Sequence, residues 1–388
     1  MSKKGKLETM SKGKDPKIKS LKELPHEILK TIYTTGIIEA ENERSASFMH
    51  LNQTTVYDKI NEMFKDQVIV MDTKEALEKY DWLESYFWKL VDKDKDEFTR
   101  RVADDWSGGY FFWIQKGAKV TFPLQSCLLI TKNNLEQRIH NIIIADEGSE
   151  AHIITGCVQH TNIDKANHLG ISEIYVKDNA TLHFSMIHHW AEKTMVRPRT
   201  GIEIGNDATF VSNYLCLNPV KDMQMYPVAY CNGVNSKASF NSIIFADKQS
   251  RVDVGSKVVL NGQNSRADIT SRGISKGNSE VYARGNLIAN SKVCRGHLEC
   301  LGLLLGGETK MFAIPELAVN VEGAELSHEA AVGKIADEQI QYLMTRGLSE
   351  SEAISAIIRG FMDISILGLP QELSNEIHKI MYDMDFGA

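Results

Sequence analysis

Hydrophobic and polar residues alternate with a period of two through the middle of the chain, from Tyr110 to about Val321. Residues 176–184 and 251–260 illustrate the pattern, because each largely places an apolar side chain at every second position. Such alternation predicts β-strands with one buried and one solvent-facing side. Asn, Asp and Gly lie between the strands and tolerate the left-handed backbone of tight turns. The middle of the chain is therefore expected to be mainly β.

A short phrase recurs inside this region: a small residue, often after Asn, Asp or Gln, followed by an alternating strand. It falls at Ala180, Ala208, Ser236, Ser250, Ser265, Ser279 and Ser291, with steps of 28, 28, 14, 15, 14 and 12 residues. Units this short hold no core of their own and must stack on their neighbours. We therefore predict a parallel β-helix or similar β-solenoid over residues 110–321. A β-sandwich is the competing interpretation, but its turns would not keep one phrase in step this long.

The segment before the array, residues 21–109, is predicted to form an N-terminal helical region. Residues 73–90 carry apolar side chains at three-to-four spacing, which is typical of a helix with one buried stripe. Asp72 and Glu75 fit a capping box at the start of this helix. The aromatic residues of the stripe are interpreted as core rather than as a ligand site.

The segment after the array, residues 322–388, is predicted to return to helices after Ser327. Gly347 is placed to stop one helix, a Ser349–Glu352 capping box opens the next, and Pro370 takes the preferred first position of a third. These helices either cap the open end of the solenoid, where strands would otherwise stay unpaired, or dock a partner. The pattern alone favours capping.

Composition excludes several classes of protein. The chain has 388 residues, is 43% hydrophobic, and carries a net charge of −7, which argues against a nucleic-acid partner. No apolar run approaches the roughly 20 residues that span a bilayer. Residues 1–20 are rich in lysine and lack the apolar core of a secretory signal, so we expect a flexible basic tail. Six cysteines without a CxxC pair predict a reducing cytoplasm.

Cys300 lies in the last predicted strands of the array, and Ser327, His328 and Glu329 follow where the array ends. Thiolate, imidazole and carboxylate groups at one end of a stack can supply a mixed metal site. Soft thiolate ligands favour zinc, Cu(I) or iron–sulfur clusters, and imidazole suits iron and zinc. Spacing alone does not bring these residues together, and a small buried cysteine is the alternative interpretation.

Other motifs point to no chemistry. The histidines at 160, 183, 188 and 189 are interpreted as satisfied solenoid or surface residues, because His188 and His189 would face opposite sides of a regular strand. The chain has no Walker A phosphate loop, so it is not expected to hydrolyse ATP itself. It also lacks GxSxG, HExxH and catalytic kinase motifs.

Six segments of the chain are specific enough to suggest a family. They are residues 80–90 (YDWLESYFWKL), 137–145 (QRIHNIIIA), 152–157 (HIITGC), 185–190 (SMIHHW), 271–277 (SRGISKG) and 327–347 (SHEAAVGKIADEQIQYLMTRG). They resemble the SufB/SufD family of iron–sulfur assembly proteins. The likeness runs from about Tyr80 to about Phe361, and the short N-terminal region resembles the compact archaeal SmsB-type members.

This resemblance implies a right-handed parallel β-helix flanked by helical regions. It implies an assembly scaffold rather than an enzyme, on which a transient iron–sulfur cluster forms before transfer to apo-proteins. A separate ABC-type ATPase of the SufC or SmsC type would bind the C-terminal helices, which reverses the preference for capping. Two scaffold chains would associate through the C-terminal ends of their β-helices, here as a cytoplasmic homodimer without a nucleic-acid or membrane partner.

The resemblance also implies site residues. Cys300 matches the essential cluster cysteine of the family, and His328 matches the shared histidine that serves as a cluster ligand on the SufD-type side. Glu329 matches the neighbouring SufB-type glutamate, so one chain carries both halves of the site. A homodimer would place Cys300 of one subunit near His328 and Glu329 of the other.

One position departs from the family pattern. SufB-type scaffolds take up sulfur on a cysteine soon after a Tyr-Pro pair, and alignment on Tyr226 and Pro227 puts Ala229 at that position. Cys231 lies two residues further on, which is the same face of a regular strand. Cys231 is therefore a possible sulfur acceptor, or sulfur arrives by another route.

Two further interpretations stay open. A SufD-like partner would support the ATPase and iron entry without holding a cluster. A β-helix carbohydrate enzyme would need a row of carboxylates along one groove, and no in-phase Asp/Glu set lies on the repeats.

Overall fold

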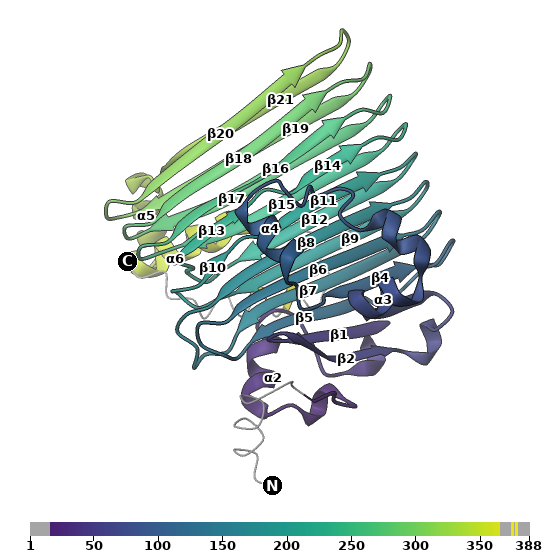
Figure 1. The fold of residues 1–388 in the computed structure, drawn as a ribbon. Coiled ribbons are helices and arrows are strands. Elements are labelled where there is room, and N and C mark those ends of the chain that lie inside the picture. Colours follow the sequence, from purple (N-terminus) through teal and green to yellow (C-terminus); the bar gives the residue numbers. More distant parts are fainter. Residues whose placement is uncertain (1–15, 365–373, 376, 379–388) are drawn as a thin grey trace.

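The computed structural model describes residues 16–364, 374–375 and 377–378. The described residues are mainly β, with 47% strand and 18% helix, and form a parallel β-solenoid of about eight turns with helices at its ends (Figure 1). The predicted fold class is confirmed. No helix in the described ranges combines the length and the apolar character that crossing a membrane requires.

Two long sheets face each other across the core. Sheet A contains, in spatial order, β2 (Thr54–Ile60), β1 (Ala46–Leu51), β5 (Leu124–Ile130), β7 (Glu150–Gln159), β9 (Thr181–His189), β12 (Thr209–Cys216), β15 (Lys237–Ala246), β17 (Arg266–Lys276), β19 (Arg295–Leu305) and β21 (Glu325–Lys334). Sheet B contains β3 (Val68–Asp72), β4 (Tyr110–Ile114), β6 (Glu136–Ala145), β8 (Asn167–Val176), β11 (Arg199–Ile204), β14 (Val228–Cys231), β16 (Arg251–Leu260), β18 (Glu280–Ala289) and β20 (Lys310–Val319), with β10 (Met195–Val196) and β13 (Asp222–Met225) bridging β8 and β16.

Each coil contributes one strand to each sheet, or two short strands to sheet B where β10 precedes β11 and β13 precedes β14, so a full coil is about twice the 14-residue phrase. Hydrogen-bonded side chains in successive turns are 28 or 29 residues apart, as in Asn235 Nδ2 to Asp207 Oδ1 and Asn264 Nδ2 to Asn235 Oδ1. The small residues at 180, 208, 236 and 265 are fully buried, and each follows a residue with positive φ. The turn phrase therefore marks the coils as the sequence predicted.

Ser291 does not belong to this series, contrary to the prediction. The equivalent residue is Cys294, which is fully buried and follows Val293 with φ 63°. The Sγ of Cys294 donates to the carbonyl of Ser291 at 2.8 Å, as the Ser236 hydroxyl donates to Gly233 at 2.7 Å. A thiol thus replaces the hydroxyl of the turn, and a cysteine was not part of the phrase we searched for.

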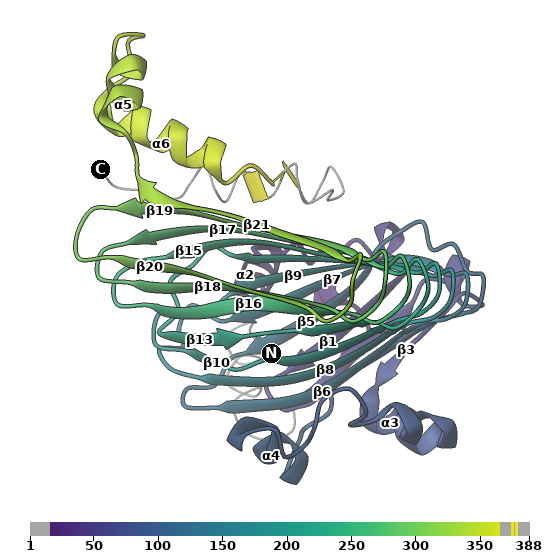
Figure 2. The same cartoon turned by 90° about the horizontal axis from the view of Figure 1, so that it is seen from above.

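Helices cover the outer faces of both sheets. On sheet A, the helices α2 (His26–Tyr33) and α6 (Glu350–Phe361) pack against outward residues such as Leu215, Ile243 and Phe245. On sheet B, the helices α3 (Thr73–Lys79) and α4 (Glu97–Asp104) pack with the 3₁₀ segment η4 (Asp81–Tyr86). In Figure 2 the helix α6 lies beside sheet A, and α5 (Asp337–Met344) packs on α6 and projects away from the sheet; neither covers the end of the array.

We predicted that residues 21–109 form a helical region, but this region is only partly helical. It contributes strands β1, β2 and β3, and the predicted helix over 73–90 ends at Lys79. All six residues of β1 are buried, so this strand shows no alternation to read. The Glu173 carboxylate accepts the backbone N–H groups of Trp88, Leu90 and Val91, which holds that part of the segment in a non-helical path.

The prediction for the C-terminal region is also partly wrong. Ser327 lies inside the strand β21 and does not mark the return to helices. This strand is almost wholly exposed and therefore lacks the alternation that marks buried strands. The later signals are confirmed: Gly347 has φ 97° after α5, and Ser349 and Glu352 form the capping box of α6. Pro370 and most of the predicted basic tail lie outside the described residues.

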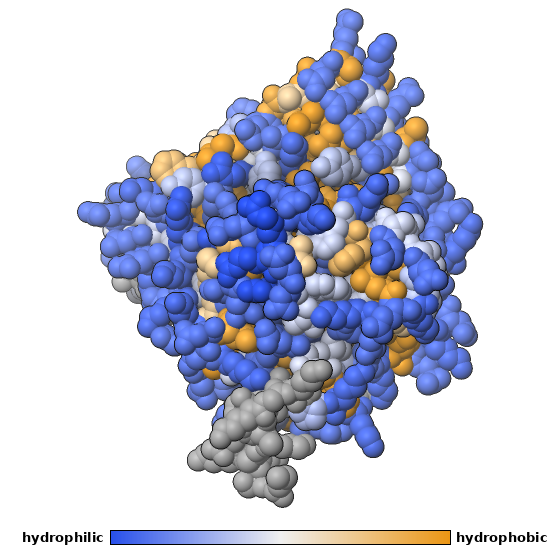
Figure 3. Space-filling view, in the orientation of Figure 1, coloured by the Kyte–Doolittle hydropathy of each residue, from blue (hydrophilic) through white to orange (hydrophobic). Residues whose placement is uncertain are grey.

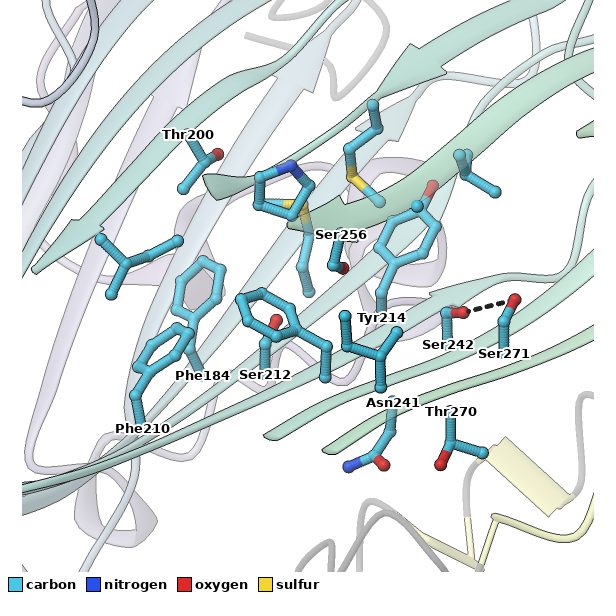
Figure 4. A pocket seen from close by; sticks show the side chains of 18 of the residues that line it. Phe184, Thr200, Phe210, Ser212, Tyr214, Asn241, Ser242, Ser256, Thr270 and Ser271 are labelled. Atoms are coloured by element: carbon cyan, nitrogen blue, oxygen red, sulfur yellow. Dashed lines mark hydrogen bonds between the residues drawn. The ribbon is translucent and has the colours of Figure 1, made fainter. Parts of the chain in front are cut away.

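The interior is packed with apolar side chains along its whole length. In the middle of the array it leaves a small cavity of about 40 Å³, enough for a few water molecules (Figure 4). Phe184 and Phe210 lie beside several hydroxyl groups there, and the Ser242 hydroxyl donates to Ser271 at 3.1 Å. Neither Cys231 nor Cys300 lines this cavity.

Candidate functional site

Cys300 lies on the inward face of β19, one coil before the end of the array. Burial along β19 alternates, so that Gly296, Leu298 and Cys300 face the core. The Cys300 side chain is 0% exposed and belongs to the main hydrophobic cluster. Burial, with a further contribution from Glu299, raises the pKa of the Cys300 thiol to about 11. The thiol is therefore protonated at neutral pH in this conformation.

His328 lies on the same side as Cys300, on the neighbouring strand. The register of β19 and β21 pairs Leu298 with His328 and Cys300 with Ala330. Side chains of paired residues point to the same face, so His328 faces the side of Leu298 and Cys300. The two residues are offset by two positions, which places their Cα atoms on the order of 8 Å apart. His328 itself is exposed.

Glu329 points to the opposite face of β21. Its partner in the register is Glu299, and both lie on the outer side of sheet A. On the same outer side the His297 ring and the Ser327 hydroxyl form a hydrogen bond of 2.9 Å. A surface groove of about 450 Å³ passes these residues and includes Asp268. Within one chain, the structure therefore brings Cys300 and His328 together but not Glu329.

The described residues contain no group of three or more His, Cys, Asp or Glu side chains arranged to hold a metal ion. The predicted site is thus not preformed within one chain. His297 and Glu299 were missed by our sequence reasoning, although the alternation of β19 puts both on the face of Glu329. Only the register between β19 and β21 reveals this neighbourhood.

The last coil is uncovered on its inner side. Leu317 and Val319 face inward on β20 but are 38% and 51% exposed, whereas their partners on β18, Leu287 and Ala289, are fully buried. In the space-filling view hydrophobic side chains reach the surface at the upper end, around β20 (Figure 3). Cys300 and His328 lie at this same end of the array.

Cys231, the possible sulfur acceptor, is a core residue at the end of β14. Ala229 and Cys231 both face the interior, as predicted for residues two apart, and both are fully buried. Burial raises the pKa of the Cys231 thiol to about 12, despite a hydrogen bond with Ser236. In this conformation Cys231 is a neutral thiol without solvent access.

The histidines that we interpreted as structural are largely buried. His188 faces the interior, where its Nδ1 lies 2.9 Å from the Tyr214 hydroxyl, and Cys157 and Cys216 are its register partners on the two neighbouring strands. His189 pairs instead with Val158, which packs on the outer side. The prediction that His188 and His189 face opposite sides is confirmed. No local sequence signal marks the ladder of Cys157, His188 and Cys216, because its members are about one coil apart in the chain.

Comparison with known proteins identifies the family. Residues 128–361 match the family model described as SUF system FeS cluster assembly, SufBD core domain. The chain belongs to the SufBD family. It is 44% identical over 96% of its length to an iron–sulfur cluster assembly SufBD family protein of Methanothermobacter thermautotrophicus, with 91% of that protein covered.

Two other archaeal SufBD family proteins are also similar to this chain over most of its length. The chain is 49% identical to one from Archaeoglobus fulgidus, over 89% of this chain and 91% of that protein. It is 34% identical to one from Pyrococcus horikoshii, over 95% of this chain and 83% of that protein. The resemblance noted from the sequence is thereby confirmed, and this SufBD protein is involved in iron–sulfur cluster assembly.

Proposed function

We propose that this SufBD protein is the scaffold on which an iron–sulfur cluster is built, held between two copies of the chain and passed to apo-proteins. The observation that carries the proposal is the position of Cys300 and His328, on one face of neighbouring strands at the uncovered end of the array. The cluster is the cargo of the protein, and ATP hydrolysis belongs to a separate ABC-type ATPase.

The ligand set suits a cluster that must be released. Cys300 supplies a soft thiolate, while His328 and Glu329 supply nitrogen and oxygen donors that bind iron less tightly than a full thiolate set. Because the pKa of Cys300 is raised to about 11 by burial, iron binding must displace the thiol proton. A site that opens when its interface separates would then release the cluster.

A second copy of the chain is the proposed cover of the open end. The strands β20 and β21 end their sheets, so each leaves one row of backbone groups without a strand partner. Leu317, Val319 and Val332 are exposed there although they lie on the inward faces of the last coil. A two-fold dimer would bury the same patch of both copies and bring Glu329 of one copy toward Cys300 of the other.

The helices α5 and α6 are the proposed docking site of the ATPase. The helix α5 has no buried residue, and Tyr342 and Met344 on it are 59% and 43% exposed. The helix α6 anchors α5 to the body, since α5 packs on α6 and Ile358 and Met362 are fully buried in the cluster on sheet A. Movement of the ATPases would therefore be transmitted to sheet A close to β19 and β21.

Anaerobic reconstitution with iron and sulfide tests the scaffold and its site. The chain is studied alone and with its ATPase by Mössbauer spectroscopy and by iron and sulfide analysis. Wild type is expected to acquire a cluster, and Cys300→Ala and His328→Ala are expected to lose it. Cys127→Ala is the matched control, because this thiol is equally buried at the other end of the array. A normal cluster in Cys300→Ala would refute the site.

The role of Glu329 is separable from a general effect of charge. Glu329→Gln is expected to weaken cluster retention, while Glu299→Gln, which changes the paired position on the same outer face, serves as its control. Equal retention in both variants would show that Glu329 is not a ligand.

A SufD-like supporting role is the alternative. The exposure of Tyr342 and Met344 would fit it equally well, because docking of the ATPase needs no cluster. In that case the chain copurifies with the ATPase, but no cluster forms in wild type even when sulfide is supplied.

We also propose that Cys231 takes up sulfur. Persulfide labelling of wild type and Cys231→Ala tests this role.

A further inference from the structure

A polar groove of about 410 Å³ crosses the outer face of sheet B. It lies between the start of α4 and the strands β16, β18 and β20, on a part of the surface where hydrophilic side chains dominate around α4 (Figure 3). Four cationic side chains line it: Lys95, Arg199, Lys257 and Arg284. The volume is in the range of small-molecule sites.

Two of these cations are already neutralised. Arg199 Nε lies 2.6 Å from Asp96 Oδ2. Arg284 makes a two-pronged contact with Asp253, with Nε to Oδ1 at 2.5 Å and Nη2 to Oδ2 at 3.1 Å. These pairs use the two nearest carboxylates of the groove and fix both arginines in place.

The two lysines have no ion pair among the described residues. Burial lowers the pKa of Lys95, and the positive charges of Arg199 and Lys257 lower it further, although Asp96 acts in the opposite direction. The groove therefore concentrates positive charge that its own carboxylates do not balance. An anion would remove this repulsion.

Neutral donors also line the groove. Burial and the nearby Glu316 raise the pKa of Tyr226 to about 12, so its hydroxyl keeps its proton at neutral pH. Asn286 donates to the Glu316 carboxylate at 2.8 Å. Glu316 is the remaining acidic group of the groove, and its charge opposes an anionic ligand.

We propose that this groove binds the phosphate group of a small molecule through Lys95 and Lys257. With the Glu316 carboxylate counted, the four cations and three carboxylates of the groove leave one net positive charge, and the two unpaired ammonium groups can each bind a phosphate oxygen as a point charge. A phosphate group offers three strong acceptor oxygens to these donors, whereas a carboxylate offers two. The proposal does not depend on the proposed cluster site, since neither Cys300 nor His328 lines the groove.

Isothermal titration calorimetry of the full chain with inorganic phosphate, in a phosphate-free buffer of low ionic strength, tests the proposal. Wild type is expected to bind one phosphate saturably. Lys95→Gln and Lys257→Gln are each expected to weaken binding roughly tenfold, as the loss of one charged hydrogen bond predicts. Lys248→Gln is the matched control, because Lys248 is paired with Glu192 at 2.7 Å outside the groove.

Glu316→Gln provides a change of opposite sign, since removing this carboxylate is expected to tighten phosphate binding. Circular dichroism confirms that each variant is folded. The proposal is overturned if wild type shows no saturable binding, if Lys248→Gln weakens binding as much as Lys257→Gln, or if acetate competes as well as phosphate.

Discussion

The two ends of the solenoid are built in opposite ways. At the N-terminal end the chain reverses, so that β2 pairs antiparallel with β1 and β3 antiparallel with β4. Aromatic side chains such as Phe48, Phe112 and Tyr110 fill the interior there and are at most 2% exposed. At the C-terminal end the strands simply stop, and the inward residue Val319 is 51% exposed.

Because the two ends differ in this way, we expect the N-terminal end to contribute mainly to stability and the C-terminal end to association with a partner. The closed end needs no partner to cover its core, because its interior apolar side chains are buried, although β2 and β3 end their sheets there. An end with unpaired edge strands and exposed inward residues is a template for association. The candidate ligands Cys300 and His328 lie at the open end, which is why their site depends on what covers it.

The largest effect on the free energy of unfolding is expected from Phe48 in the core of the closed end, compared with Phe312 on the outer face of the last coil. Phe48→Ala at the closed end removes a ring that contacts Tyr110 and Phe112 and should cost about 3–5 kcal/mol. Phe312→Ala at the open end, where the ring is 42% exposed and stacks on Tyr282, should cost less than about 1.5 kcal/mol. Urea unfolding measures both, and equal costs would contradict the comparison.

Acid should destabilise the N-terminal half through its buried histidines. Burial lowers the pKa of both His50 and His168 to about 3, so the folded protein keeps them neutral while the unfolded chain protonates them near pH 6.5. Their contribution is complete above pH 6.5 and is lost as the pH falls toward 3, at about 1.4 kcal/mol per pH unit for each residue.

Urea unfolding between pH 7.5 and 4.5 measures this slope. His168→Gln, which keeps a polar side chain beside Gln137, should reduce the slope by about 1.4 kcal/mol per pH unit below pH 6.5. An unchanged slope would mean that His168 is accessible to protons in the folded protein.

A smaller effect is expected along the asparagine ladder at the edge of the coils. Asn261 donates to Asn232 and accepts from Asn290, whereas Asn320 in the last coil only donates to Asn290. Asn261→Ala should therefore cost about 1 kcal/mol and Asn320→Ala about half of that. Thermal unfolding compares the two, and a larger loss in Asn320→Ala would show that the last rung has a further partner.

The smallest effect on the fold of the single chain is expected from Val319→Lys, because this side chain is already half exposed. Its effect on association should be large, since a lysine on the inward face of the last coil opposes burial against a second copy. Analytical ultracentrifugation is expected to show a monomer for Val319→Lys. Val234→Lys, at 45% exposure in a turn, should leave the dimer intact. A dimeric Val319→Lys would place the interface elsewhere.

Much of the fold was accessible from the sequence because a solenoid repeats its local chemistry. Each coil needs a left-handed turn residue and a buried small residue, and these recur in the chain at fixed intervals. The strand β21 escaped the pattern because an exposed edge strand has no buried face to produce alternation. The strand β1 escaped it for the opposite reason, because both of its faces are buried.

The sequence by itself determined the coiled architecture and the family, because turn chemistry, strand alternation and the family segments are all local. Only the tertiary structure decided that Cys300 and His328 share a face while Glu329 lies on the other side, because this depends on the register of β19 against β21. It alone also placed α6 on the side of sheet A, since the outward apolar residues that hold it come from strands far away in the chain.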